Sequence, residues 1–537
     1  MSDLQGLSLL GFGRGAPGPR TFHAQNPATG ERLEPSYQAA APADVDRACA
    51  LASQAFEAYS RALASERAAF LRAIAEGLEG AREPIVERCQ AETALPPARL
   101  QAELGRTTHQ LRLMAAVAEE GSWGDARIDT ADPDRKPAPR PDVRSMRRAL
   151  GPVAVFGSSN FPLAFSVAGG DTASALAAGN TVIVKAHPLH PGTSERVGEV
   201  VAASARRCGL SEGTFSLLFD DGFTVGESLV RHPLVQAVGF TGSRAGGEAL
   251  VRLAASRAQP IPVYAEMGSV NPVVVLPGAL RERSRALAEG LHASFTLGVG
   301  QFCTNPGVVL IEAGAVGDVF EQHLVELTRS TPVGVMLGAR IGAAYRRGLE
   351  RLRGLGATPL SEGATRADVA TGQAALWRTD VPAALAAPGL LEEVFGPSTL
   401  LVRYRDAADL ERLVRSLDGQ LTASVHALPE ELPTFGSLLR LLAGKAGRVV
   451  INQFPTGVEV NHAMVHGGPF PATSDGRSTS VGTRAIERFS RLVAYQNFPQ
   501  EALPPELQDA NPRALWRVIN GGRTPGPVAG IGDRPSG

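Results

Sequence analysis

The sequence predicts an α/β protein with more than one domain, and three observations predict it. The chain has 537 residues, which is more than a single hydrophobic core usually supports. From Pro152 onward, short β-branched runs alternate with helical stretches, as in parallel sheets joined by right-handed crossovers. Residues 40–120 precede these runs and carry Ala, Leu, Glu and Arg at helical spacing, so they predict amphipathic packing helices.

The β-branched runs fall into two sets, so the simplest organisation is two α/β domains that join near residue 266. The proline-rich residues 127–146 precede both sets and predict an extended arm, which is either a linker or a strand exchanged between subunits. Residues 521–537 are a Pro/Gly-rich tail. The expected strands are 153–156, 181–184, 215–218 and 237–240 in the first set, and 273–276, 308–311, 399–402, 423–426 and 448–451 in the second.

Composition and charge exclude several classes of function. The net charge is -1 and only Lys136, Lys185 and Lys445 are lysines, so no basic field for nucleic acid is expected. Residues 1–30 lack the pattern of a signal peptide, and no apolar run approaches the roughly 20 residues that span a bilayer. The four cysteines show no Cys-x-x-Cys spacing, which predicts neither a disulfide framework nor a metal site. We therefore expect a cytoplasmic protein that binds no nucleic acid, membrane or metal.

One cysteine stands out because it lies in a glycine-bounded turn between a helical pattern and a β-branched run. A thiol in such a turn, with a helper elsewhere in the chain, can attack a carbonyl carbon. The alternative is a cysteine that packs as a small hydrophobe. The segment is Gly300-Gln301-Phe302-Cys303-Thr304-Asn305-Pro306-Gly307.

Ligands of open α/β sheets bind at the carboxyl ends of the strands, so the turns that follow the strands are candidate binding sites. Asn160 follows the first strand, where its amide could donate a hydrogen bond or cap a helix. Lys185 follows the second and is either a cofactor contact or a solvated charge. Gly242 and Ser243 form a strand-to-helix turn that suits a pyrophosphate, although it is not the G-x-G-x-x-G fingerprint.

Glu266 lies in an apolar, glycine-containing segment that is expected between strands. Burial there would raise its pKa toward neutrality, as a general base requires. The alternative is an exposed loop glutamate.

Together these segments resemble the aldehyde dehydrogenase superfamily from about residue 20 to 500. Six motifs occur in the family order: 160–162, Lys185, 240–243, 266–268, 300–303 and 393–397. The resemblance implies a Rossmann-type cofactor domain with a five-stranded parallel sheet, an α/β catalytic domain, a small bridging element and at least a homodimer, with a homotetramer left open. The implied boundaries are 1–126 and 147–265 for the cofactor domain, 266–483 for the catalytic domain, 127–146 and 484–500 for the bridging and oligomerisation element, and 501–537 for a C-terminal tail.

The resemblance also implies catalytic roles. Cys303 would attack an aldehyde, and the Asn160 amide with the Cys303 backbone N–H would bind the oxyanion. Glu266 would activate the water that hydrolyses the resulting thioester. His462 and His466 lie in a C-terminal segment that approaches the nucleophile in some relatives, and we select His466, with a funnel-lining or backbone-satisfied histidine as the alternative.

The resemblance implies a nicotinamide cofactor as well. Lys185 and Glu393 match positions that hold its two riboses, Ser243 and Gly242 face the pyrophosphate, and Phe395 and Ser158 lie in matching segments. Pro188 stands where many NAD-preferring members carry a glutamate that repels a 2′-phosphate. We therefore expect NADP as the preferred cofactor with NAD usable, and His187 is a candidate for a second cation near the phosphate.

Two longer runs, 159–172 and 456–469, look like the branch that contains α-ketoglutaric semialdehyde (2,5-dioxopentanoate) dehydrogenases and the fatty aldehyde dehydrogenases of luminous bacteria. We expect oxidation of the semialdehyde to 2-oxoglutarate, with a fatty aldehyde as the alternative. A CoA-acylating enzyme commonly lacks the glutamate found here at 266, and a non-enzymatic use of the fold is disfavoured by intact Cys303, Glu266 and Asn160. Phe156, Phe165, Phe302 and Phe454 are candidates for the tunnel wall, and no motif marks which arginine would bind a substrate carboxylate.

Overall fold

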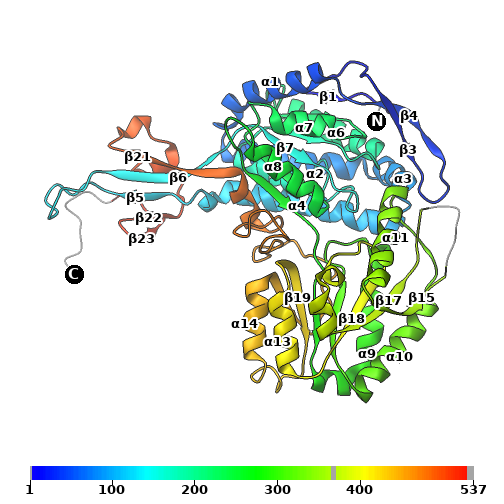
Figure 1. Ribbon diagram of the computed structural model, residues 1–537. Helices are drawn as coiled ribbons and strands as arrows, with labels where there is room; N and C mark the ends of the chain where they lie inside the picture. Colours follow the sequence, from blue (N-terminus) through cyan, green and yellow to red (C-terminus); the bar gives the residue numbers. More distant parts are fainter. Residues whose placement is uncertain (1–2, 365–369, 529–537) are drawn as a thin grey trace.

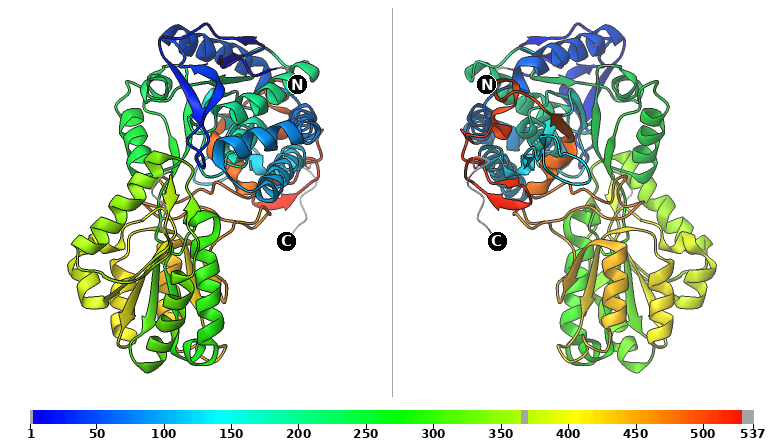
Figure 2. Two further views of the ribbon diagram at one scale, coloured as in Figure 1. Left: turned by 90° about the vertical axis from the view of Figure 1, so that its right-hand side faces the viewer. Right: turned by 90° about the vertical axis from the view of Figure 1, so that its left-hand side faces the viewer.

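The computed structural model describes residues 3–364 and 370–528, which form two α/β domains and a projecting arm (Figure 1). The domain with the N-terminal helices and the domain with the second strand set are stacked one above the other, as two further views confirm (Figure 2). Within the described residues, no helix combines the length and apolar character needed to cross a membrane.

The upper domain contains a seven-stranded sheet of order β11-β10-β7-β8-β9-β1-β2. The first five strands of this order are parallel, and the two short strands at the far edge are antiparallel. The five parallel strands match the sheet implied by the family resemblance. The strands are β7 (Val153–Phe156), β8 (Val182–Lys185), β9 (Phe215–Leu218), β10 (Ala237–Thr241), β11 (Val263–Glu266), β1 (Leu9–Leu10) and β2 (Gly13–Arg14).

One of these strands corrects an expectation. Glu266 was expected between strands, but it is the last residue of β11, opposite Thr241 in β10. The strand was missed because only four residues separate Pro262 from the loop that begins at Met267, and one β-branched residue is too weak a signal.

Helices cover both faces of this sheet because successive side chains of each strand point to opposite faces. Val153 and Val155 of β7 belong to the core shared with residues 68–78 and 104–118, whereas Ala154 belongs to the core on the opposite face, which includes residues 45–52. The helices are α1 (Pro42–Tyr59), α2 (Ala64–Gly80), α3 (Arg82–Thr93), α4 (Pro97–Glu120), α5 (Gly170–Ala178), α6 (Pro191–Arg207), α7 (Thr224–Arg231) and α8 (Arg244–Ala255), and β3 (Thr21–Gln25) pairs with β4 (Arg32–Gln38) in a hairpin.

The lower domain has a second seven-stranded sheet, of order β15-β17-β18-β13-β12-β19-β20, in which only β15 is antiparallel to its neighbour. Val274 faces one core and its neighbours in β12 face the other. The strands are β12 (Val273–Val275), β13 (Val308–Glu312), β15 (Thr358–Glu362), β17 (Ala375–Asp380), β18 (Ser398–Tyr404), β19 (Gln420–His426) and β20 (Ala446–Ile451). The main helices are α9 (Pro277–Thr296), α10 (Ala315–Arg329), α11 (Ala339–Gly354), α12 (Val381–Ala386), α13 (Ala407–Ser416) and α14 (Gly436–Lys445), and β14 (Gly334–Val335) pairs with β16 (Thr371–Gly372).

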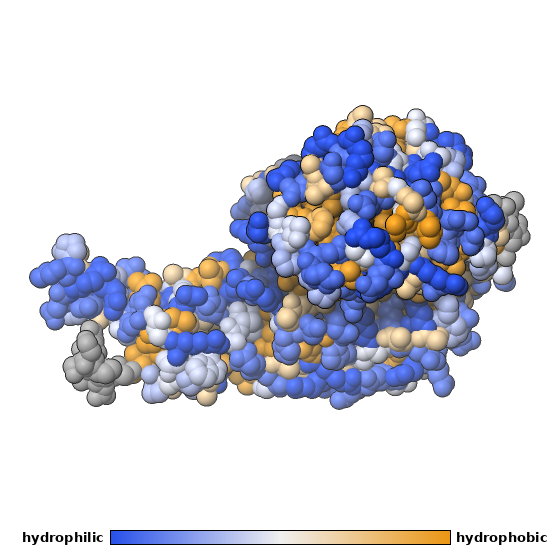
Figure 3. Space-filling model, turned by 90° about the horizontal axis from the view of Figure 1, so that it is seen from below, coloured by the Kyte–Doolittle hydropathy of each residue, from blue (hydrophilic) through white to orange (hydrophobic). Residues whose placement is uncertain are grey.

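The arm is a five-stranded sheet of order β21-β6-β5-β22-β23 that projects from the body (Figures 1 and 3). Its strands are β5 (Arg127–Asp129), β6 (Val143–Ala149), β21 (Ser490–Gln496), β22 (Arg517–Ile519) and β23 (Gly522–Thr524). The tail expected at 501–537 is not wholly separate from the arm, because β22 pairs with β5 and β23 pairs with β22; residues 529–537 lie outside the described part.

Candidate active site

Cys303 lies in a tight turn between η2 (Leu297–Gly300) and β13, and it is half-buried. Gly300 has φ +64° and a Cβ there would lie 2.2 Å from the Gly396 carbonyl oxygen, so the turn requires glycine. The amide of Asn271 fixes the far side of the turn, because its Nδ2 donates to the carbonyl oxygens of Cys303 (2.8 Å) and Asn305 (2.9 Å). The thiol is therefore held on rigid backbone.

Cys303, His466 and Glu266 form one cluster at the junction of the two domains. His466 Nε2 lies 3.4 Å from Cys303 Sγ and 2.8 Å from Glu266 Oε1. Ser480 Oγ donates to Glu266 Oε2 at 2.6 Å. His466 and Glu266 are buried, with 1% and 3% of their side chains exposed. The sequence candidates thus meet at a single point, and a small cavity of about 10 Å³ beside Glu266 and His466 has room for about one water molecule.

The pKa values of Cys303 and Glu266 are shifted in opposite directions. Burial raises the pKa of the Cys303 thiol well above its ordinary value, and the Glu266 carboxylate raises it further. Burial also acts to raise the pKa of Glu266, but the His466 charge and hydrogen bond, together with the Ser480 hydrogen bond, outweigh it and hold that pKa below its ordinary value. The expected upward shift of Glu266 is therefore wrong, because tertiary partners stabilise the carboxylate.

Asn160 lies beside the nucleophile turn and does not cap a helix. Its Nδ2 donates to the Gln301 carbonyl oxygen at 2.9 Å, and its own carbonyl oxygen accepts from Arg99 Nη2 at 2.8 Å. The next helix, α5, begins ten residues later at Gly170. A buried amide donor is thus directed at the backbone that carries Cys303.

Two of the four candidate tunnel phenylalanines lie near the cluster. The ring of Phe165 lies 6.3 Å from that of His466, and Phe302 packs edge-on against Phe161 at 5.4 Å. Phe156 instead contacts Phe240 beside the first sheet, and Phe454 contacts His426 in the second domain. The last two are packing residues, as aromatic side chains in apolar runs commonly are.

The turn before α8 presents an exposed helix N-terminus. Ser243 is the N-cap and its Oγ accepts from the backbone N–H of Gly246 at 3.2 Å. The Gly242 N–H donates to the Glu266 carbonyl oxygen at 3.0 Å, and a Cβ at Gly242 would lie 2.7 Å from the Phe240 ring. Residues 242–245 are exposed, so the positive end of the α8 dipole is open to an anionic group.

Lys185 ends β8, and its Nζ donates to the Asp220 carbonyl oxygen at 2.8 Å. Burial lowers its pKa to about 8, although Asp220 and Asp221 act in the opposite direction. Burial, with His190 and Lys185, lowers the pKa of His187 well below its ordinary value. His187 is therefore neutral and does not supply the second cation considered from the sequence.

Glu393 reaches the nucleophile region from the loop after η3 (Pro388–Leu391), and Phe395 is half-buried in the same loop. Burial raises the pKa of Glu393 to about 7. A Cβ at Gly268 would lie 2.3 Å from Glu393 Oε2, so the glycine makes room for this carboxyl group. Ser158, by contrast, is almost fully buried, with its carbonyl oxygen 2.8 Å from His190 Nε2 and its Oγ 3.5 Å from the Phe161 carbonyl oxygen.

Two residues of the site were missed from the sequence. Asn271 and Ser480 were not assigned roles, because single Asn and Ser residues in polar or glycine-rich runs give no local signal. Ser480 is separated from Glu266 by 214 positions, so only the folded chain reveals the contact.

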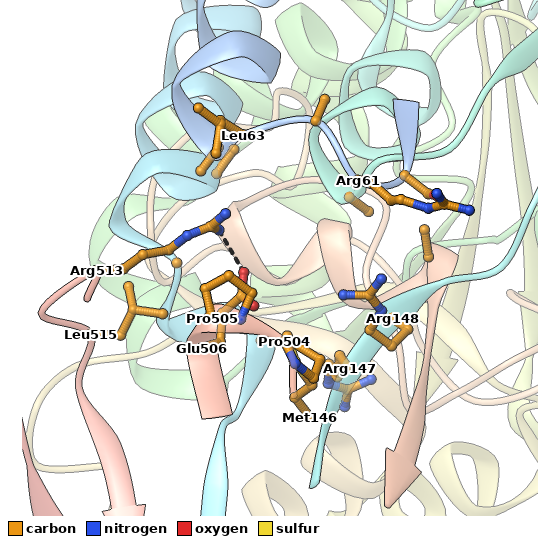
Figure 4. A pocket seen from close by; sticks show the side chains of 18 of the residues that line it. Arg61, Leu63, Met146, Arg147, Arg148, Pro504, Pro505, Glu506, Arg513 and Leu515 are labelled. Atoms are coloured by element: carbon orange, nitrogen blue, oxygen red, sulfur yellow. Dashed lines mark hydrogen bonds and ion pairs between the residues drawn. The ribbon is translucent and has the colours of Figure 1, made fainter. Parts of the chain in front are cut away.

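A cavity of about 510 Å³ lies elsewhere, at the base of the arm between the start of α2, strand β6 and residues 502–515 (Figure 4). Arg61, Arg148 and Arg513 line it, and Arg513 forms an ion pair with Glu506 at 2.5 Å. None of the sequence-predicted site residues is among its lining residues. This cavity is therefore separate from the Cys303 cluster.

Comparison with known proteins identifies the family of the chain. Residues 15–492 match the Aldehyde dehydrogenase family. The chain is 51% identical over 522 residues to alpha-ketoglutaric semialdehyde dehydrogenase 2 of Azospirillum brasilense, covering 97% of this chain and 99% of the relative. It is 45% identical over 523 residues to alpha-ketoglutaric semialdehyde dehydrogenase of Acinetobacter baylyi, with the same coverage.

Solved structures share the fold. Gamma-glutamyl-gamma-aminobutyraldehyde dehydrogenase of Burkholderia cenocepacia superposes with a TM-score of 0.79 at 21% identity, covering 92% of this chain and 97% of that one. A point mutant of betaine aldehyde dehydrogenase of Staphylococcus aureus, in complex with NAD+, superposes with a TM-score of 0.78 at 20% identity, covering 93% and 99%. The predicted fold class and family resemblance are confirmed: the chain belongs to the aldehyde dehydrogenase family.

Proposed function

We propose that this protein oxidises an aldehyde to a carboxylic acid through a thioester on Cys303, with NAD(P) as cofactor. The contact of Cys303 Sγ with His466 Nε2 at 3.4 Å, in a cluster completed by Glu266, carries the proposal. A thiol next to a coupled imidazole and carboxylate is the arrangement that activates a cysteine nucleophile.

The chain's residues account for both halves of the reaction. In the first, Cys303 Sγ bonds to the aldehyde carbon while its proton passes to His466 Nε2, because the raised thiol pKa keeps the free thiol protonated. Asn160 Nδ2 donates to the developing oxyanion. A bound NAD(P) would supply the acceptor for the hydride of the thiohemiacetal carbon. In the second half, water attacks the thioester carbon and Glu266, ionised because its pKa is low, takes a proton from that water, while the Cys303 thiolate leaves and recovers its proton from His466.

The residues present fit a nicotinamide dinucleotide. The exposed N-terminus of α8 suits the pyrophosphate, with Gly242 and Ser243 beside it. The Glu393 carboxyl group, whose pKa burial raises to about 7, can hydrogen-bond a ribose hydroxyl. Lys185 can bind the other ribose. Phe395 and Ser158 are also proposed to lie near the cofactor. Because Ser158 is buried, it would act by holding the turn after β7 in place and not by direct contact.

NADP is the proposed preferred cofactor, with NAD usable. No carboxylate stands at position 188, which is Pro188. The carboxylates that act on Lys185, those of Asp220 and Asp221, are both paired with Arg20, at 2.6 and 2.7 Å. Their repulsion of a 2′-phosphate is therefore weakened.

The proposed substrate is 2,5-dioxopentanoate (α-ketoglutaric semialdehyde), and the product is 2-oxoglutarate. The support is the 51% and 45% identity, over nearly the whole chain, to two relatives named for this substrate. A fatty aldehyde is the competing substrate, and it is an outcome of the test below.

A homodimer formed through the arm is also proposed, together with the domain boundaries implied by the resemblance. Strands β20 and β21 lie at sheet edges, so their outer backbone groups are available for pairing with a second copy. Val449, Ile451 and Leu492 on these strands are exposed, and the arm presents apolar surface in the view from below (Figure 3). The four free cysteines support the expected cytoplasmic location.

Steady-state kinetics test the proposal. The expected result is a higher kcat/KM for 2,5-dioxopentanoate than for decanal, with NADP and with NAD. Cys303→Ala should abolish turnover, whereas the matched variant Cys208→Ala, at another half-buried free cysteine outside the site, should retain it. Full activity of Cys303→Ala would contradict the mechanism, and a preference for decanal would replace the proposed substrate. Static light scattering tests the dimer, which a monomeric mass would contradict.

A further inference from the structure

A semialdehyde that carries a carboxylate needs a cation near the nucleophile, and the sequence did not mark one. In the structure, Arg99 bonds the Asn160 backbone beside the Cys303 turn. Arg106 and Arg448 lie where they can interact electrostatically with Cys303. An unpaired carboxylate is costly to bury, whereas a guanidinium group binds it with charge-assisted hydrogen bonds. The three arginines differ in whether a buried terminal nitrogen of the guanidinium group is left without a hydrogen-bond partner.

Two of these arginines donate hydrogen bonds to backbone carbonyl oxygens of the protein. Arg99 Nη2 donates to the Asn160 carbonyl oxygen, and its guanidinium lies over the ring of Phe302 at 4.8 Å. Arg448 donates from Nη1 and Nη2 to the carbonyl oxygens of Gly457 (2.9 Å) and Pro455 (2.6 Å), so both of its terminal nitrogens are bonded and only its buried Nε has no partner in the described part of the chain. Each therefore supports backbone that borders the site.

Arg106 differs from both. Its guanidinium lies over the ring of Phe165 at 4.9 Å, and its Nη2 makes one long hydrogen bond, 3.4 Å, to the Val458 carbonyl oxygen. Its Nη1 is buried and has no hydrogen-bond partner in the described part of the chain. A buried, unsatisfied donor on a charged group is unfavourable unless a ligand completes it.

The position of Arg106 connects it to the site. It lies one turn after Glu103 on α4, and Glu103 Oε1 accepts from the backbone N–H groups of Leu163 and Ala164, which fixes the helix against the turn after Asn160. Phe165, beneath the guanidinium, is the residue whose ring faces His466. Arg106 thus stands where two segments singled out in the sequence, 159–172 and 456–469, meet.

The carboxylates that face Arg106 are those of Glu103, Glu266 and Glu459, and each favours the charged guanidinium against the effect of burial. Glu103 is shared with Arg99, which approaches it to 3.8 Å, and Glu459 is exposed. The guanidinium therefore stays charged while its Nη1 is left without a bonded anion.

We propose that Arg106 binds the far carboxylate of the substrate through Nη1 and thereby selects short aldehydes that carry a carboxylate over apolar aldehydes. This inference rests on the proposed function, because it assigns the specificity of the same site. The guanidinium lies over the ring of Phe165, and the Val458 carbonyl oxygen of the 456–469 segment accepts from its Nη2.

The test compares Arg106→Met and Arg106→Lys with the matched control Arg112→Met. Arg112 lies on the same helix but is exposed and paired with Glu79 at 2.6 Å. For each protein, kcat and KM are measured with 2,5-dioxopentanoate and with pentanal, and binding of glutarate, an unreactive dicarboxylate, is measured by the shift in melting temperature.

Arg106→Met should raise KM for 2,5-dioxopentanoate by roughly ten- to a hundredfold, as expected for one charged hydrogen bond, with a much smaller change in kcat. The selectivity for 2,5-dioxopentanoate over pentanal should fall in parallel, and the glutarate shift should disappear. Arg106→Lys should recover part of both, because it keeps the charge and loses the planar donor pair. Arg112→Met should behave as the wild type.

An unchanged selectivity ratio in Arg106→Met would overturn the proposal. So would an equal loss with both aldehydes and a lowered melting temperature, since Arg106 would then only support the loop at Val458. If the methionine variant does not fold, Arg106→Lys decides by the same ratio. Wild-type protein that oxidises neither aldehyde contradicts the proposed function, whereas glutarate binding that depends on Arg106 would still support the anion site.

Discussion

Replacing Glu266 by glutamine should separate the two halves of the reaction. The amide has nearly the same volume as the carboxylate, so it can still accept from Ser480 Oγ, which lies 2.6 Å from Oε2. It cannot take a proton from water. It also removes the negative charge that raises the pKa of Cys303. Thioester hydrolysis should slow, while attack by Cys303 persists.

The expected size of the effect follows from the role of the carboxylate. Loss of a positioned general base costs about 10²- to 10⁴-fold in rate, or about 3 to 5 kcal/mol of barrier. Because the Cys303 pKa falls when the charge of Glu266 is removed, the first half should start at lower pH than in the wild type. The two halves should therefore change in opposite directions.

The rates of both halves are measured by rapid mixing of Glu266→Gln with aldehyde and cofactor. The absorbance of the reduced nicotinamide reports the reaction. We expect a burst of one equivalent per active site and then slow turnover. Ser480→Ala, which removes one hydrogen bond but keeps the base, should show a smaller loss. A steady-state rate within about tenfold of the wild type would refute the reasoning. A stalled second half in His466→Asn with normal turnover of Glu266→Gln would reassign the base to the imidazole.

Three further predictions concern the rest of the site. Asn160→Ala should lower kcat by about 10²- to 10³-fold with little change in melting temperature, because it removes one oxyanion donor; an unchanged kcat would contradict that role. The pKa of Glu393 is about 7 in the folded protein and 4.5 for the unperturbed side chain. Between these pH values the folded protein therefore holds a proton that the unfolded chain has released, and the stability that this proton contributes is lost as pH rises through 7. Glu393→Gln should therefore gain in melting temperature relative to the wild type between pH 4.5 and 7, and a difference that does not vary with pH would count against the buried position. Pro188→Glu should lower kcat/KM for NADP by about tenfold or more relative to NAD, since the new carboxylate would repel a 2′-phosphate, and an unaltered ratio would remove the basis for the NADP preference.

The sequence predicted those parts of the site that depend on local turns. Cys303 and Ser243 lie in turns whose glycines and caps are readable from neighbouring residues, and the strands before Asn160 and Lys185 are short buried β-branched runs. These patterns are local, so they survive without knowledge of the tertiary structure. The five parallel strands of the first sheet follow from the same alternation of strand and helix.

What the sequence could not predict depends on contacts between distant segments. The choice of His466 over His462 rested on resemblance; in the structure His466 is buried against Cys303 and His462 is exposed. The sign of the Glu266 pKa shift was wrong because His466 and Ser480 come from the far end of the chain. Strands β22 and β23 were missed because each is only three residues long and is ordered by its pairing, β22 with β5 and β23 with β22.

The most direct test of the account is to identify the covalent intermediate. Glu266→Gln is mixed with 2,5-dioxopentanoate and NADP, quenched with acid, digested and analysed by mass spectrometry. The account predicts an acyl group on the peptide that contains Cys303, with its appearance matching the burst of reduced cofactor. Reduced cofactor formed without any acylated Cys303 peptide would contradict it.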